Sequence, residues 1–409
     1  MDIVSRSFER HSTLFLGLIM KVQLSVLSIF LMLVVFPTLA GSRQKNPERA
    51  RDLGIPFNGT SGKWNAITDV PSVEIGYSTL IRGAGKWKVG EGPVRTGVTV
   101  VLPRGKTQGS YNVGHFVFNG DREMTGIPYM QDYGRGGGAI GITNTNSVGV
   151  VKDAIGEWQY KAFASKSPMD FSFGLPIVAK TWDGGLNDIN GYHVKKEHVF
   201  EAVNSAASGP VAEGNVGGGT GMTCYWFKCG TGTSSRLAKI GTTEYTVGVL
   251  VQANFGRRED LTVAGVPVGR EITELDMVEA PQQDGSIIVI VGTDAPLSSS
   301  QLNLVAKRAA LGMGRTGTIG DSASGNIFLA FSTVKSDYDA TTHIGTTRSL
   351  SKSNLNPVFR ATVEATEEAI INALVAGEDM EGVNGNKAFG IPHDRLRDVM
   401  KKYNRIRPR

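Results

Sequence analysis

The 409-residue chain is poor in the side chains on which most catalytic motifs depend, with six histidines and two cysteines. It contains no Gly-x-Ser-x-Gly segment followed by a histidine, no His-Glu-x-x-His and no Gly-x-x-x-x-Gly-Lys-Ser/Thr phosphate loop. These absences exclude the usual serine-hydrolase elbow, the zinc-protease helix and the phosphate-binding loop. The glycine-rich run at 214–221 lacks the spacing of a dinucleotide fingerprint, so no cofactor is expected.

The two cysteines, Cys224 and Cys229, lie close together in the sequence. Two thiols alone make a poor metal site, and His193 and His198 have no ligand spacing with them, so no metal is expected. In an oxidising compartment the cysteines could form a disulfide across a loop. A structural role, with or without that bond, is favoured over a thiol nucleophile, because no histidine lies nearby in the sequence.

Charge clusters and long apolar runs are also scarce. The net charge of +5 is dispersed, which gives no sign of a nucleic-acid-binding module. The apolar run from Val22 to Phe36 follows Lys21 and precedes Ala40, which is typical of a signal peptide over residues 1–40. A membrane anchor that includes 14–20 is the alternative, although Lys21 interrupts it. We therefore expect an exported protein, periplasmic or secreted, with no membrane contact after signal removal.

Glycine is abundant, with 52 residues, and short β-branched runs alternate with a few amphipathic segments after an irregular arm at 41–65. Strands are predicted at 97–103, 139–143, 245–253, 286–292 and 327–332. Helices are predicted at 299–311, ended by Gly312, at 356–375, and less clearly at 195–207. In the long helix we place Glu364 and Glu368 on the solvent side. The mixture predicts an α+β layered fold in one compact domain.

A polar turn, Asp284-Gly285-Ser286, runs directly into the strongest predicted strand. Gly285 places no side chain against its own carbonyl, and the Ser286 hydroxyl can attack that carbonyl if the turn is strained. Cleavage would give Ser286 a free α-amine, whose pKa near neutrality suits it to act as its own base. Taken alone, Asp-Gly-Ser before a strand is more often only a turn.

Eight sequence blocks, in order, resemble the family of L-aminopeptidase/D-esterase and β-peptidyl aminopeptidases, over most of the chain from about Gly97. The blocks are 119–126 (NGDREMTG), 141–149 (GITNTNSVG), 181–191 (TWDGGLNDING), 214–221 (GNVGGGTG), 251–256 (VQANFG), 284–288 (DGSII), 323–328 (ASGNIF) and 364–369 (EATEEA). The resemblance implies a four-layer αββα sandwich of the N-terminal-nucleophile kind with different connectivity. It also implies self-cleavage between Gly285 and Ser286 into a long chain, 41–285, and a short chain, 286–409. Such chains stay associated, assemble as a homo-oligomer of pairs, and release N-terminal residues from small peptide, amide or ester substrates without a metal.

By position, the resemblance makes Ser286 the nucleophile and the Asn254 amide the donor to the oxyanion. The hydroxyl of Ser324 would form a hydrogen bond near the nucleophile, and the ring of Trp182 would line the substrate pocket. Taken alone, Asn254 is better interpreted as a structural turn amide.

Two positions depart from the family pattern, since relatives carry acids where this chain has Lys180 and Asn326. A lysine would repel the ammonium group of an N-terminal substrate, which points to neutral or anionic acyl groups. Alternatively, Lys180 faces solvent and another acid serves. Two further alternatives remain: acyl transfer to an amine, for which fold relatives use threonine at the junction, and a degenerate, non-catalytic member of the same fold.

Overall fold

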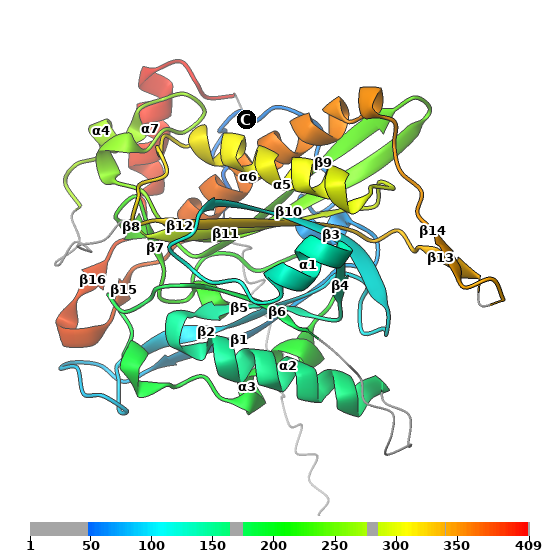
Figure 1. Cartoon of the computed structure of the whole chain (residues 1–409). Coiled ribbons are helices and arrows are strands. Elements are labelled where there is room, and N and C mark those ends of the chain that lie inside the picture. Colours follow the sequence, from blue (N-terminus) through cyan, green and yellow to red (C-terminus); the bar gives the residue numbers. More distant parts are fainter. Residues whose placement is uncertain (1–47, 164–174, 276–284, 340, 408–409) are drawn as a thin grey trace, which may run out of the picture. The chain divides into compact units, whose positions relative to one another are not determined.

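Two β-sheets lie face to face at the centre of the molecule, which the computed structural model describes over residues 48–163, 175–275, 285–339 and 341–407 (Figure 1). The first sheet has the order β1 (Glu74–Arg82), β2 (Val94–Leu102), β5 (Ile140–Asn144), β6 (Ile177–Thr181). The second has the order β4 (Arg135–Gly137), β3 (Ser110–Asn119), β12 (Gly325–Ser332), β11 (Ser286–Thr293), β10 (Thr243–Asn254), β9 (Thr231–Ile240). Pairing is parallel between β5 and β6 and between β11 and β12, and antiparallel between the other neighbours.

Helices cover the outer face of each sheet. Helices α2 (Val148–Phe163) and α3 (Lys196–Ser205) pack on the first sheet, and α5 (Ser299–Gly314) and α6 (Asn356–Val375) pack on the second (Figure 1). Strand β11 is apolar on both faces, which explains why both are covered. Ile288 and Ile290 belong to the core between the sheets, while Ile287 and Val289 belong to the core under α5 and α6. The expected four-layer αββα sandwich is therefore confirmed.

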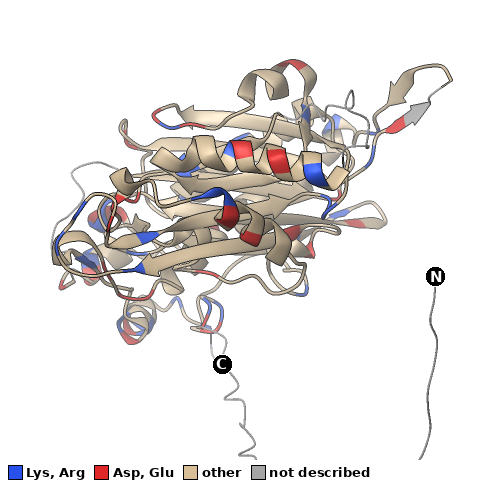
Figure 2. Cartoon of the chain, turned by 90° about the horizontal axis from the view of Figure 1, so that it is seen from below, with Lys and Arg blue, Asp and Glu red and all other residues tan. Residues whose placement is uncertain are grey.

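The remaining elements are short. They are α1 (Ile127–Tyr133), α4 (Val268–Glu271), α7 (His393–Lys402) and the hairpins β7 (Thr223–Cys224) with β8 (Phe227–Lys228), β13 (Asp337–Asp339) with β14 (Ile344–Thr346), and β15 (Met380–Glu381) with β16 (Lys387–Ala388). A disulfide joins Cys224 to Cys229, which is the optional pairing expected from the sequence. Acidic and basic residues are interspersed along the described chain (Figure 2). No helix within the described residues is long and apolar enough to span a membrane, and the expected signal peptide lies outside those residues.

The predicted strands and helices are all present, with two errors of detail, whereas several other elements, among them β1, β3, β6, β9, α2 and α7, were not predicted. Helix α5 does not end at Gly312 as predicted but continues to Gly314. Gly312 instead permits close packing against α6, because a Cβ there would lie 2.6 Å from both the Val363 oxygen and the Thr366 Cβ. Helix α2 was not predicted, although Val148, Val151 and Ile155 are buried at helical spacing. Residues 48–65 contain no helix or strand, as expected of the arm.

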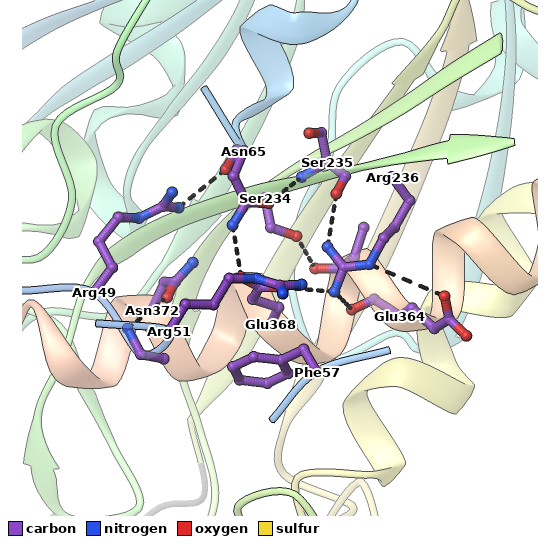
Figure 3. A network of polar contacts seen from close by, with 12 residues as sticks. Arg49, Arg51, Phe57, Asn65, Ser234, Ser235, Arg236, Glu364, Glu368 and Asn372 are labelled. Atoms are coloured by element: carbon purple, nitrogen blue, oxygen red, sulfur yellow. Dashed lines mark hydrogen bonds and ion pairs between the residues drawn. The ribbon is translucent and has the colours of Figure 1, made fainter. Parts of the chain in front are cut away.

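The placement of Glu364 and Glu368 toward solvent is wrong, because both side chains are buried. The carboxylate of Glu368 accepts hydrogen bonds from Arg51 (2.7 Å from both Nε and Nη2), Arg236 (2.5 Å from Nη2) and Asn65 (2.6 Å from Nδ2). Figure 3 shows how these donors converge on α6 from the N-terminal arm and from β9. Two arginines and one asparagine donate to this carboxylate and offset the free-energy cost of burying it. The helical spacing of the sequence alone does not reveal these long-range partners.

Candidate active site

Ser286 is the first residue of β11 and lies in the middle of the second sheet. It pairs with Asn254 at the end of β10 and with Gly325 at the start of β12. Its side chain is fully buried, and its Oγ has no hydrogen-bond partner among the described residues. A buried hydroxyl without a partner is costly for stability, so this position is a candidate for chemistry.

Asn254 is held by hydrogen bonds on both sides of its amide. Its Nδ2 donates to the backbone oxygen of Trp182 at 2.9 Å, and its Oδ1 accepts from the backbone nitrogen of Thr223 at 2.9 Å. These bonds define the amide orientation and use one of its two N–H groups. The second N–H is not used in these bonds, and it belongs to the residue that pairs with Ser286 across the sheet. Thr223 had no role in the sequence analysis.

Gly285 lies against the backbone of Asn254. A Cβ at this position would be 1.5 Å from the Asn254 oxygen and 3.0 Å from its Nδ2. Only glycine fits here, because any other side chain would collide with the backbone of β10. The bond between Gly285 and Ser286 is therefore packed directly beside the amide of Asn254.

Ser324 and Asn326 flank Gly325, the strand partner of Ser286. The Ser324 Oγ donates a hydrogen bond to the Asn326 Oδ1 at 2.9 Å, and not to Ser286. The Asn326 Nδ2 is buried and has no partner within the described part of the chain. These residues thus adjoin the nucleophile through the neighbouring strand.

Trp182 follows β6, and its side chain is 37 % exposed at the edge of this site. The ring packs over Gly184, where a Cβ would lie 2.5 Å from the indole. The next residue, Asp183, is fully buried and accepts a hydrogen bond from Asn187 Nδ2 at 3.1 Å. Burial raises the pKa of Asp183 to about 6, while hydrogen bonds with Thr96, Asn187 and Asn144 oppose that rise.

Lys180 is half-buried on β6 rather than fully exposed. Burial, followed by the charge of Arg122, lowers the pKa of Lys180 to about 8, against smaller opposing effects of Glu123 and Asp121. Arg122 lies in one of the sequence blocks, but the sequence analysis assigned it no role. The tertiary structure brings it next to Gly325. The structure therefore gathers Ser286, Gly285, Asn254, Gly325 and the end of β6 at one end of the two sheets.

Comparison with known proteins agrees with this arrangement. The model of peptidase family S58 matches residues 65–388. Two β-peptidyl aminopeptidases named BapA are similar to the chain: that of Sphingosinicella microcystinivorans is 48 % identical over 90 % of this chain and 96 % of its own, and that of Sphingosinicella xenopeptidilytica 44 % over 91 % and 95 %. The solved L-aminopeptidase D-Ala-esterase/amidase of Ochrobactrum anthropi, described as a prototype of the serine aminopeptidases and a variant of the Ntn hydrolase fold, is 43 % identical with a TM-score of 0.82, over 88 % of this chain and 99 % of its own. A β-aminopeptidase from Burkholderia sp. is 41 % identical with a TM-score of 0.79, over 88 % and 100 %.

Proposed function

The chain belongs to peptidase family S58, and from that premise we propose that it cleaves its own Gly285–Ser286 bond and then hydrolyses amides with Ser286. Its membership of an aminopeptidase family and its Ntn-hydrolase fold make it a hydrolase of the peptidase class. The observation that carries the finer proposal is the unpartnered, fully buried Oγ of Ser286, at a Gly–Ser bond packed against the Asn254 amide.

In the self-cleavage, the Ser286 Oγ attacks the carbonyl carbon of Gly285. The C–N bond breaks, the hydroxyl proton goes to the departing Ser286 nitrogen, and an ester joins Gly285 to the Ser286 oxygen. Water then hydrolyses the ester, which leaves a carboxylate on Gly285 and a free amine and hydroxyl on Ser286. In this proposal the Asn254 amide stabilises the oxyanion, and one such donor contributes about 3–4 kcal/mol to lowering a barrier of this kind.

In substrate hydrolysis the same groups act again. The free α-amine of Ser286 accepts the proton of the hydroxyl as Oγ attacks the acyl carbon of the substrate, and then gives that proton to the departing amine. Water releases the acyl group from Oγ as an acid. An unperturbed α-amine has a pKa of about 7.7–8.0, so a rate that depends on it rises with pH up to roughly that value.

The two chains produced by cleavage, 41–285 and 286–409, are proposed to remain associated. Contacts that cross the junction support this, including those of Arg51, Arg236 and Asn65 with Glu368. The strand pairing of β11 with β10 also joins the two chains. Export to the periplasm or medium, and assembly of the pairs into a homo-oligomer, stay predictions from the sequence.

The intact masses of the purified protein and of a Ser286→Ala variant, recorded under denaturing conditions, test the proposal. Two chains that break between Gly285 and Ser286 in the wild type, with the variant left as one chain, are expected. The wild type should then hydrolyse simple amides and esters, and the variant should not. A single intact, inactive wild-type chain would refute the proposal and favour a non-catalytic member of the fold.

A further inference from the structure

The disulfide between Cys224 and Cys229 closes a loop that is bonded to the chain around Asn254. Hydrogen bonds join residues 223–230 to three consecutive residues, 253–255. They run from Thr223 N to the Asn254 Oδ1 at 2.9 Å, from Tyr225 N to the Phe255 oxygen at 2.8 Å, and from Ala253 N to the Gly230 oxygen at 2.9 Å. The position of the Asn254 amide therefore depends on the conformation of this loop.

The tip of the loop has a backbone conformation that its residues disfavour. Cys224 pairs with Phe227, so Tyr225 and Trp226 form a two-residue hairpin turn. Both turn residues have a positive φ, 53° for Tyr225 and 59° for Trp226, as a type I′ turn requires. Such turns favour asparagine and glycine, because a Cβ crowds the following carbonyl oxygen at positive φ. The surrounding structure must therefore hold this turn in place.

Two sets of bonds hold the turn. Arg258 donates from Nε to the Tyr225 oxygen at 2.9 Å and from Nη2 to the Trp226 oxygen at 2.6 Å. The disulfide joins Cys224, immediately before the turn, to Cys229 on the other arm of the hairpin. Arg258 thus binds the turn itself, whereas the covalent bond ties its two arms together.

The residue that donates to Asn254 is one peptide bond from the cross-link, because Thr223 directly precedes Cys224. The disulfide itself is buried, with Cys224 1 % and Cys229 0 % exposed. Without the covalent bond, the arms can separate and the turn can relax, which would move Thr223 and the amide that it holds. A small displacement of a group that acts on the reacting atoms can lower a rate by about a hundredfold.

We propose that the Cys224–Cys229 disulfide positions the Asn254 amide, so that self-cleavage and amide hydrolysis are fast only after this bond has formed. Its formation removes two electrons and two protons from the two thiols. A disulfide oxidant such as oxidised glutathione accepts them and becomes two thiols. The chain therefore becomes active in an oxidising compartment. The proposal rests on the function proposed above, and the two cysteines are positioning residues that take no part in bond breaking on the substrate.

Cell-free synthesis of the full chain, with either dithiothreitol or a mixture of oxidised and reduced glutathione, tests the requirement for the disulfide. Alkylation of free thiols under denaturing conditions, followed by intact mass, reports the disulfide and the cleavage between Gly285 and Ser286 in one sample. We expect cleaved chains with glutathione, and cleavage slower by about tenfold or more with dithiothreitol. Equal cleavage rates in chains whose cysteines are alkylated would overturn the proposal.

Replacing both cysteines, in Cys224→Ala/Cys229→Ala protein, should slow self-cleavage as dithiothreitol does. In the cleaved enzyme, kcat for an aminoacyl p-nitroanilide should fall by about tenfold or more with little change in KM, because an oxyanion donor acts in the transition state. Adding Trp226→Gly should restore part of both rates, since glycine adopts a positive φ without a cross-link. Wild-type rates without the cysteines would overturn the proposal.

Glu368→Gln is the matched control for a general loss of stability. Its partner Arg236 lies on β9 opposite Val247, far along β10 from Asn254. Self-cleavage and kcat should stay at wild-type values in this variant, and a loss equal to that of the cysteine variant would overturn the positioning role. Trp226→Gly in a chain that keeps both cysteines replaces the cysteine variant if that variant fails to fold. Its self-cleavage should be less sensitive to dithiothreitol than that of the wild type, and equal sensitivity would overturn the proposal.

Hydrogen exchange separates this inference from the hydrolase function, because it needs no activity. In Ser286→Ala protein, replacing both cysteines with alanine should speed amide exchange in peptides that cover 222–230 and 250–256 and leave α6 unchanged. Unchanged exchange at 250–256 would overturn the proposal even in an active hydrolase. Faster exchange there, in a chain that neither cleaves itself nor hydrolyses amides, would support the positioning role and refute the hydrolase function alone.

Discussion

Removing the charge of Glu368 should destabilise the protein far more than removing the charge next to it in the sequence. Glu368 has 0 % side-chain exposure, and its partner Arg236 has 1 % (Figure 3). A Glu368→Gln change keeps the shape but leaves the buried Arg236 with backbone oxygens and a single nearby carboxylate, that of Glu364, whose oxygen lies 4.0 Å away. Breaking one side of a buried ion pair costs about 3–5 kcal/mol.

Glu367→Gln is the matched control, because Glu367 lies on the same helix and pairs with Arg315, whose side chain is 44 % exposed. An ion pair of this kind contributes less than about 1 kcal/mol. Both changes are best made in Ser286→Ala protein, so that urea unfolding of one uncleaved chain is measured. Equal costs for the two variants would refute the idea that the Glu368 contacts stabilise the fold.

The pH dependence gives a second check on Glu368. Burial alone would raise the pKa of Glu368, but the donors Arg51, Arg236 and Asn65 outweigh burial and lower it. A lowered carboxyl pKa contributes stability that is present above the unfolded pKa and is lost as pH falls through the folded pKa. The acid loss of stability should therefore be smaller in Glu368→Gln than in its parent. In cleaved protein, the same variant should release the short chain at a lower urea concentration.

Three further results are expected. Gly285→Ala should leave the chain uncleaved by intact mass, because its Cβ would overlap the Asn254 oxygen, while Gly314→Ala, which meets nothing within 4 Å, should be cleaved normally. Asp183→Asn should gain about 1–1.5 kcal/mol of stability relative to the wild type as pH rises from 5 to 7.5, because a carboxyl pKa raised to about 6 gives stability that is lost as pH rises from the unfolded value to 6, at about 1.4 kcal/mol per pH unit. The absence of a pH-dependent difference between variant and wild type in urea unfolding would contradict this. Gly312→Ala should cost about 1–3 kcal/mol in urea unfolding through overlap with α6, and a neutral result would mean that the helices separate easily.

Local pattern was sufficient for much of the fold. The alternation in 286–292 and the periodicity of 299–311 and 356–375 depend on neighbours in the sequence, and each element formed where predicted. The Gly285–Ser286 junction was also visible, because a glycine before a serine at the start of a buried strand is a local feature. The order of the layers came from the resemblance of the sequence blocks to a known family, because hydrophobic periodicity carries no information about how elements stack.

The tertiary structure decided which polar groups lie together. Glu368 has the spacing of a solvent-facing helix position, yet the arm at 48–65 and β9 bring Arg51 and Arg236 to it from distant parts of the chain. Arg122 lies in one of the quoted sequence blocks, but its contact with Gly325 joins distant parts of the chain, and the block alone does not reveal it. Burial and long-range pairing determine the energy of a charge, so a sequence shows which charges exist but not which of them meet.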